Sequence, residues 1–253
     1  MTYDFFDVRV SAVSVLTPSA VRVTFTGRGL SSFVSGGRDQ RFKLFFAAPG
    51  QAEAIVPRTP DWYLDWRAMD PAVRGIMRTY TVAEHRPDGF DVDFALHPGV
   101  TGPASAWAAT ARVGDPLLVL GPTVTDNGGV DFQPPPGTDW VLLAGDETAV
   151  PALAAIRSYI GNQLPVHTFI AAAPARCEPG GVHCPAGLLA PVRGAALPAG
   201  TPYAFIAGES GEVRALRRHL VRERGFDKRR VRFSGYWRRG ATEDDLTAAP
   251  EGD

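Results

Sequence analysis

Apolar and polar residues alternate with a period of two through much of the first half of the chain. The alternation is clearest in four segments, 8–10, 21–25, 42–46 and 91–96. A period of two sends successive side chains to opposite faces, which is typical of strands with one buried face. Turns rich in Gly and Pro separate these segments. We therefore predict a small antiparallel β-barrel or sandwich.

The pattern changes in the second half. Residues 140–144 form a nearly continuous apolar run, and shorter runs follow at 166–171, 203–207 and 231–233. Between these runs, apolar residues recur with helical spacing at 150–163 and 213–224. Buried strands that alternate with helices are typical of a parallel sheet covered on both faces. The second half is therefore predicted to be α/β.

Two turn-rich segments, 126–129 and 133–137, separate the halves and favour neither a helix nor a central strand. We accordingly predict a β-barrel domain over 1–130 and an α/β domain over 138–240. The last segment, 241–253, is acidic and poor in large apolar residues, so we expect a flexible tail.

Composition and charge narrow the functional classes. The 253 residues carry 26 Lys and Arg against 27 Asp and Glu, so the net charge of −1 argues against a nucleic-acid or membrane-surface protein. The N-terminus lacks a secretory pattern, and no apolar stretch approaches the about 18 residues of a membrane span. The only two cysteines, Cys177 and Cys184, cannot form a disulfide framework. We expect a cytoplasmic protein that binds neither nucleic acid nor a membrane.

The tetrapeptide Arg78-Thr79-Tyr80-Thr81 is the first candidate binding motif. In an extended segment, Arg78 and Tyr80 point to one side, and Thr79 and Thr81 point to the other. A guanidinium binds phosphate, and a phenol ring packs against a flat heteroaromatic ligand. Taken alone, the motif is more often an ordinary surface strand.

The segment from His97 to Ala108 is predicted to leave a strand and enter a helix. Thr101 or Gly102 stands near the predicted cap, and Pro103 suits the first turn. Gly99 and Gly102 allow a ligand close to the backbone, and the N–H groups of a helix start bind anions such as pyrophosphate. A plain loop capped by a helix accounts for this segment alone equally well.

The second half offers a further candidate at Gly145-Asp146-Glu147-Thr148-Ala149, directly after the first apolar run. Open α/β sheets bind ligands at the carboxyl ends of their strands. The carboxylates of Asp146 and Glu147 repel phosphate, and either could cap the helix start. A GxGxxG fingerprint is absent.

Together these motifs resemble the siderophore-interacting protein family, the FAD-dependent ferric-siderophore reductases of the ferredoxin-reductase-like superfamily. The resemblance extends over nearly the whole chain. Its segments are 42–45, 78–81, 93–97, 102–108, 145–152, 207–209 and 235–240. It implies an N-terminal antiparallel β-barrel that binds FAD, followed by a parallel-sheet α/β domain for a nicotinamide cofactor.

The resemblance also implies three sets of site residues. FAD would be held by Arg78, Thr79, Tyr80, Thr81, His97, Gly99, Gly102, Pro103, Ala104 and Ser105. The donor, NADPH or NADH, would lie near Gly145, Asp146, Glu147, Thr148, Ala149, Gly208 and Glu209. Asp146 and Glu147 would then contact its nicotinamide or ribose, or cap the helix start. Arg176 slightly favours NADPH, although an ordinary loop arginine is equally compatible. The ferric siderophore would meet Lys43, Trp237 and Arg238. A solvated surface cation is an equal alternative for Arg238 and the commoner one for Lys43.

The implied activity passes electrons from NAD(P)H through FAD to Fe(III), so that Fe(II) is released in the cytoplasm. Such chemistry depends on the flavin, and we name no catalytic acid or base. We predict no metal site, because Cys177, His183 and Cys184 lack a fourth ligand. A general NAD(P)H:flavin or ferredoxin-type oxidoreductase, or a binding protein without turnover, remains as an alternative. The sequence leaves open the siderophore class and whether NADH, NADPH or a ferredoxin is the donor.

Overall fold

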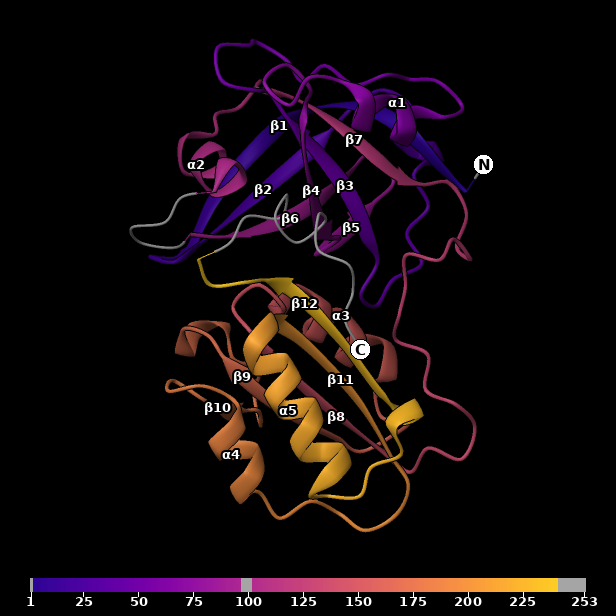
Figure 1. The fold of residues 1–253 in the computed structure, drawn as a ribbon, viewed down its shortest axis with the longest axis vertical. Helices are drawn as coiled ribbons and strands as arrows, with labels where there is room; N and C mark the ends of the chain where they lie inside the picture. The colour runs from indigo at the N-terminus through magenta and orange to yellow at the C-terminus, as the bar shows by residue number, and fades with distance from the viewer. Residues whose placement is uncertain (1, 97–101, 241–253) are drawn as a thin grey trace. The chain divides into compact units, whose positions relative to one another are not determined.

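The computed structural model describes residues 2–96 and 102–240 and divides into two compact units. The units are Met1–Val130 and Asp131–Asp253, and Figure 1 traces both along the chain. The predicted residues His97 and Gly99 and the predicted flexible tail 241–253 lie outside the described residues.

An antiparallel sheet of seven strands forms the first unit, in the order β4-β3-β7-β1-β2-β6-β5. Its strands are β1 (Tyr3–Thr17), β2 (Ala20–Thr26), β3 (Arg41–Phe46), β4 (Ile76–Thr81), β5 (Glu84–Arg86), β6 (Gly89–Ala95) and β7 (Pro116–Pro122). The helices are the 3-10 turn η1 (Leu30–Ser32), α1 (Trp62–Ala68) and α2 (Pro103–Thr110).

The two edges of this sheet are joined by a very short link. Only Val82 and Ala83 separate β4 at one edge from β5 at the other. The Val82 N–H donates to the Gln40 carbonyl at 3.0 Å, and the Ala83 N–H donates to the Asp91 carbonyl at 2.9 Å. The sheet therefore curls upon itself, as predicted for a small barrel.

Side chains alternate between two apolar clusters of this unit. Phe42 and Leu44 of β3 belong to the inner core with Phe25, Phe90 and Phe94. An outer cluster contains Phe45, Trp66, Met77, Leu118 and Leu120. The α1 segment thus covers part of the outer face, which explains why apolar residues of β3 do not all point inward.

The second unit is a parallel sheet of five strands in the order β10-β9-β8-β11-β12. Its strands are β8 (Trp140–Asp146), β9 (Val166–Ala171), β10 (Val182–His183), β11 (Pro202–Glu209) and β12 (Val231–Trp237). The helices are α3 (Val150–Ile160), α4 (Leu189–Gly194), α5 (Ser210–Arg222) and the 3-10 turns η2 (Pro174–Arg176) and η3 (Lys228–Arg230). Helix α3 packs on one face of the sheet, and α4 and α5 pack on the other (Figure 1). The predicted α/β fold class is confirmed.

The last strand is longer than the sequence predicts. The prediction ends it at Phe233 and treats the following Gly235-Tyr236-Trp237 as a connection, whereas β12 continues to Trp237. Glycine weakens a strand and favours a turn in sequence reasoning. Here it makes room, because a Cβ on Gly235 would lie 2.4 Å from the Ser210 hydroxyl oxygen.

In the part of the chain that is described, no helix combines the length and apolar character needed to cross a membrane.

Candidate functional site at the carboxyl edge of the parallel sheet

The strand order of the second unit contains a switch point. From β8 the chain first adds β9 on one side of β8 and later adds β11 on the other. At such a point the connections lead away in opposite directions, and the carboxyl ends of the two strands border a ligand crevice. Asp146 ends β8 and Glu209 ends β11. The residues predicted to bind the nicotinamide donor therefore gather at this edge.

Asp146 is the centre of the hydrogen bonding there. Its Oδ1 accepts the backbone N–H of Thr148 at 2.9 Å and the Thr148 hydroxyl at 2.5 Å. Its Oδ2 accepts the Glu209 N–H at 2.8 Å and the Trp237 indole N–H at 2.7 Å. The carboxylate therefore joins β8, β11 and β12. It does not cap α3, whose N-cap residue is Ala149.

Two of the predicted glycines permit close packing. A Cβ on Gly145 would lie 2.5 Å from the Cβ of Ala149, so Gly145 lets the start of α3 approach β8. Gly208 has a φ of 136°, and a Cβ there would lie 2.6 Å from Asp146 Oδ2. Ala149 is fully buried, so its side chain serves packing.

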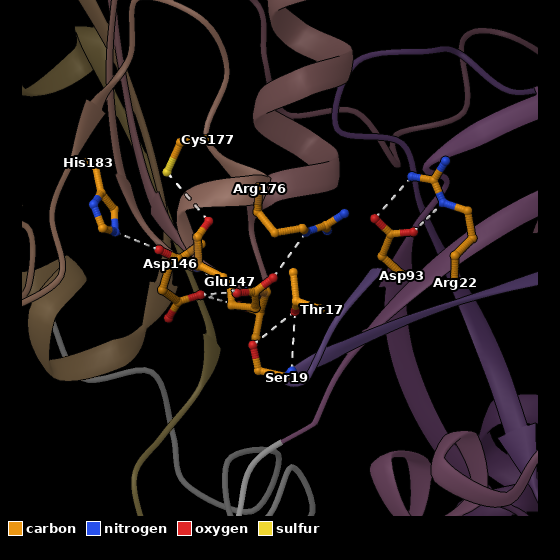
Figure 2. A network of polar contacts seen from close by, with 12 residues as sticks. Thr17, Ser19, Arg22, Asp93, Asp146, Glu147, Arg176, Cys177 and His183 are labelled. Carbon is orange, nitrogen blue, oxygen red and sulfur yellow. Dashed lines mark hydrogen bonds and ion pairs between the residues drawn. The ribbon is translucent and has the colours of Figure 1, made fainter. Parts of the chain in front are cut away.

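Glu147 forms an ion pair with Arg176 (Figure 2). Its Oε1 accepts from the Arg176 Nε at 3.1 Å, and its Oε2 accepts the Ala173 N–H at 3.2 Å. The two side chains are 14% and 9% exposed, so they shield each other from solvent. Arg176, which slightly favours NADPH in the sequence, already has a carboxylate partner.

Glu209 caps the amino end of α5, where it accepts the Glu212 N–H at 2.9 Å. Burial alone would raise the pKa of Glu209, but hydrogen bonds from the backbone N–H groups of Glu212, Arg239 and Gly211 outweigh it. The pKa of Glu209 therefore lies below its ordinary value, and the group is a carboxylate at neutral pH.

Trp237 and Arg238 are predicted to meet the ferric siderophore. Trp237 is the last residue of β12, and Arg238 follows it. The register between β11 and β12 shifts at this point, so that Gly208 pairs with Gly235 and Glu209 pairs with Trp237. Tyr236 is the extra residue of this β-bulge, and a bulge re-aims the side chains that follow it. The indole thereby reaches Asp146, while Arg238 is exposed.

Within the first unit, β4 carries the predicted flavin motif. Tyr80 packs against the inner core, with its ring centroid 4.6 Å from that of Phe94, whereas Met77 belongs to the outer cluster. Arg78 is 8% exposed and donates to the Met77 carbonyl at 2.7 Å. The alternation of β4 therefore places Arg78 and Tyr80 on one side, as predicted.

Lys43 of β3 lies directly opposite Thr79 of β4. The Lys43 ammonium donates to the Thr79 hydroxyl at 2.6 Å. A residue predicted for the siderophore and one predicted for FAD thus lie together on the outer face of the sheet.

The start of α2 contains three of the residues predicted for FAD, Pro103, Ala104 and Ser105, and Gly102 precedes it. Gly102 is the N-cap and Pro103 stands at the first helical position, and no side chain of the described residues caps the first turn. Among the described residues other than its chain neighbours, none comes within 4 Å of a Cβ built on Gly102. The backbone N–H groups of a helix start favour an anion. Ala104 is buried in the inner core, and the Ser105 hydroxyl donates to the Ala95 carbonyl at 2.9 Å. These contacts hold the helix start in place.

Both cysteines are free thiols. Burial raises the pKa of Cys177, as does the charge of Glu147, and burial also raises the pKa of Cys184. Across residues 2–96 and 102–240, no three His, Cys, Asp or Glu side chains form a group that could hold a metal ion.

Sequence reasoning missed Ser210 as a site residue. Its hydroxyl donates to the Trp237 carbonyl at 2.9 Å and occupies the space left by Gly235. Ser210 follows Glu209 directly, but the contact joins residues 27 positions apart, so local spacing carries no signal of it.

Two family models match the chain. Residues 9–126 match the siderophore-interacting FAD-binding domain, and residues 179–240 match the siderophore-interacting protein model. An uncharacterized protein of Mycobacterium tuberculosis is 34% identical, over 93% of this chain and 90% of the relative. The chain belongs to the siderophore-interacting protein family. Its first unit is an FAD-binding domain.

Named relatives of this family member extend over most of its length. The ferric vibriobactin reductase ViuB of Vibrio cholerae is 29% identical, over 90% of this chain and 88% of that protein. The NADPH-dependent ferric-chelate reductase of Escherichia coli is 26% identical, over 92% of both chains. The crystal structure of a siderophore utilization protein from T. fusca has a TM-score of 0.79 and 29% identity, and the match covers 96% of this chain and 95% of that one.

Proposed function

We propose that the protein is an FAD-dependent reductase of ferric siderophores that takes electrons from NADPH or NADH and releases Fe(II) in the cytoplasm. The observation that carries the proposal is the full-length similarity to ferric-siderophore and ferric-chelate reductases, together with the FAD-binding domain match. A ferredoxin as an alternative donor is part of the same proposal.

In this proposal, the first unit binds FAD and the second binds the nicotinamide donor. Arg78 and the start of α2 would hold the FAD phosphates, and Tyr80 would pack against the flavin region. The carboxyl edge of the parallel sheet, around Gly145 and Gly208, would receive the nicotinamide donor. Lys43 and Arg238 would attract an anionic ferric complex by long-range electrostatics.

NAD(P)H gives up two electrons together as a hydride, whereas each Fe(III) accepts only one. FAD, when bound, would supply this chemistry, since a flavin can take up two electrons together and release them singly. The overall balance is one NADPH and two Fe(III) complexes converted to NADP⁺, one proton and two Fe(II) complexes. Fe(II) is a softer ion than Fe(III), so the oxygen donors of a siderophore hold it less tightly. The protein needs to bind and orient, and no side chain has to transfer a proton.

An anaerobic spectroscopic experiment tests this function. The purified protein is expected to be yellow, to bleach when NADPH or NADH is added, and to regain its colour when a ferric siderophore follows. Equal rates with ferredoxin or free flavin would instead identify a general oxidoreductase. A colourless protein that FAD cannot reconstitute would contradict the proposal.

Replacing Arg238 with alanine is expected to raise KM for a trianionic iron(III) tris-catecholate about threefold to tenfold at low salt. The corresponding KM for an uncharged iron(III) tris-hydroxamate should stay unchanged, because only the charged complex is attracted over a distance. Steady-state kinetics at two salt concentrations measure the effect. Arg222→Ala is the matched control, since it removes the same charge at the far end of α5, about 18 Å along the helix from Ser210. An equal rise in KM for both complexes would show that Arg238 does not attract the charged complex over a distance.

A further inference from the structure

Three side chains hold the segment that presents Arg238. The Trp237 indole N–H donates to Asp146 at 2.7 Å, and the Ser210 hydroxyl donates to the Trp237 carbonyl at 2.9 Å. Beyond Arg238, the Arg239 backbone N–H donates to Glu209 at 3.3 Å. We call Asp146, Glu209 and Ser210 the clamp. Its contacts lie on both sides of Arg238, so they fix the course of the chain there.

Asp146 has no acceptor capacity left for a cofactor. A carboxylate offers about four lone-pair positions. Asp146 already accepts from four donors: the Thr148 N–H, the Thr148 hydroxyl, the Glu209 N–H and the Trp237 indole N–H. A nicotinamide or ribose group could bind this carboxylate only by displacing one of them.

Two glycines and a β-bulge make room for the hydrogen bonds of the clamp. A Cβ on Gly208 would come within 2.6 Å of Asp146 Oδ2, and a Cβ on Gly235 would come within 2.4 Å of Ser210 Oγ. The β-bulge at Tyr236 then turns Trp237 toward Asp146. Gly208, Gly235 and the β-bulge therefore all help the clamp to hold the segment around Arg238.

We propose that Asp146, Glu209 and Ser210 are positioning residues that fix Trp237 and Arg238 for an anionic ferric complex, and that Asp146 is not a ligand of the nicotinamide donor. The inference rests on the proposed function. A cation held in one place binds a rigid trianion better than a cation on a mobile segment, because less conformational entropy is lost on binding.

Asp146→Asn tests the proposal, because asparagine has the same shape but turns an NH₂ group toward two of the four donors. We expect KM for iron(III) tris-catecholate to rise about fivefold to tenfold, with kcat within about twofold. KM for NADPH and KM for the uncharged tris-hydroxamate should remain at the wild-type values. Ser210→Ala, which removes one milder contact, should raise KM for the tris-catecholate about threefold.

A double-mutant cycle tests whether Asp146 affects KM for the tris-catecholate through Trp237. If Asp146 acts through the indole, adding D146N to W237F should raise KM for the tris-catecholate by less than about twofold, far short of the effect of D146N alone. The indole N–H signals of the five tryptophans provide a readout independent of activity. In a ¹⁵N–¹H spectrum, W237F identifies the Trp237 signal, and D146N should move that signal most.

Asp139→Asn is the matched control. Asp139 Oδ2 accepts the Thr201 N–H at 2.6 Å next to the amino end of β8, so this variant makes the same chemical change at the opposite end of the strand. It should leave KM for the tris-catecholate and the Trp237 signal at their wild-type values.

Two results would overturn the clamp. One is a D146N variant with unchanged KM for the tris-catecholate and an unmoved Trp237 signal. The other is a raised KM for NADPH, which would make Asp146 a donor contact. Failure of the proposed function is distinguishable from both, because the wild-type protein itself would then not reduce ferric complexes, while the Trp237 signal would still report on the clamp.

Discussion

Replacing Arg78 with alanine is expected to weaken FAD binding about 100-fold, so that the protein is purified nearly colourless. The guanidinium is buried on β4 and is aligned by the Met77 carbonyl, so its place is fixed before any phosphate binds. Arg78→Lys should weaken FAD binding about tenfold, since an ammonium keeps the charge but not the planar, two-pronged geometry of the guanidinium. Flavin absorbance per protein and FAD titration of the apoprotein measure both effects.

Arg58→Ala is the control for this loss. Arg58 pairs with Asp7 on the surface of the same unit, and both side chains are about half exposed or more. Exposed pairs contribute little, so R58A should keep its FAD. An R78A protein that retains flavin like the wild type would remove Arg78 from the phosphate site.

Replacing Gly208 with alanine is expected to lower the free energy of unfolding by about 2–4 kcal/mol. The residue has a φ of 136°, which side chains other than glycine rarely adopt, and the new Cβ would lie 2.6 Å from Asp146 Oδ2. Asp146 would have to move, and its bonds to Glu209 and Trp237 would weaken. Urea unfolding followed by tryptophan fluorescence measures the change.

Gly225→Ala is the reference for a positive φ without a close contact. Gly225 also has a positive φ, of 73°, but a Cβ there would meet nothing within 4 Å. We expect Gly225→Ala to lower the free energy of unfolding by about 1 kcal/mol, because alanine is strained at a positive φ. If G208A and G225A destabilise the protein equally, the approach of Asp146 to Gly208 has no energetic importance.

The periodicity of the sequence predicted both sheets well, because burial on one face or on both leaves a direct trace in residue order. The strand at 140–144 and the helical spacing at 150–163 correspond to β8 and α3. The α1 helix was not predicted. It is only seven residues long, and it forms because Trp66 packs on the outer face of the sheet, which no local pattern records.

The sequence predicted where the candidate residues lie in the fold, but not which contacts they make. The ends of β8 and β11 lie at one edge of the sheet, since neighbouring parallel strands end together. The Asp146–Trp237 bond joins residues 91 positions apart and depends on the β-bulge, so spacing could not reveal it. Asp146 and Glu147 were expected to meet nicotinamide or ribose, or to cap the helix start. The structure shows both carboxylates bound to donors of the protein, and their contact with a nicotinamide cofactor stays a prediction.

The close approaches at Gly208 and Gly235 restrict how this part of the chain can evolve. A side chain at position 208 is compatible only with a shorter or displaced group at 146, and one at 235 only with a smaller residue than Ser210. These positions lie on three different strands and on α5, yet a replacement at one requires compensation at another. Homologues that differ here should therefore covary in pairs, 146 with 208 and 210 with 235.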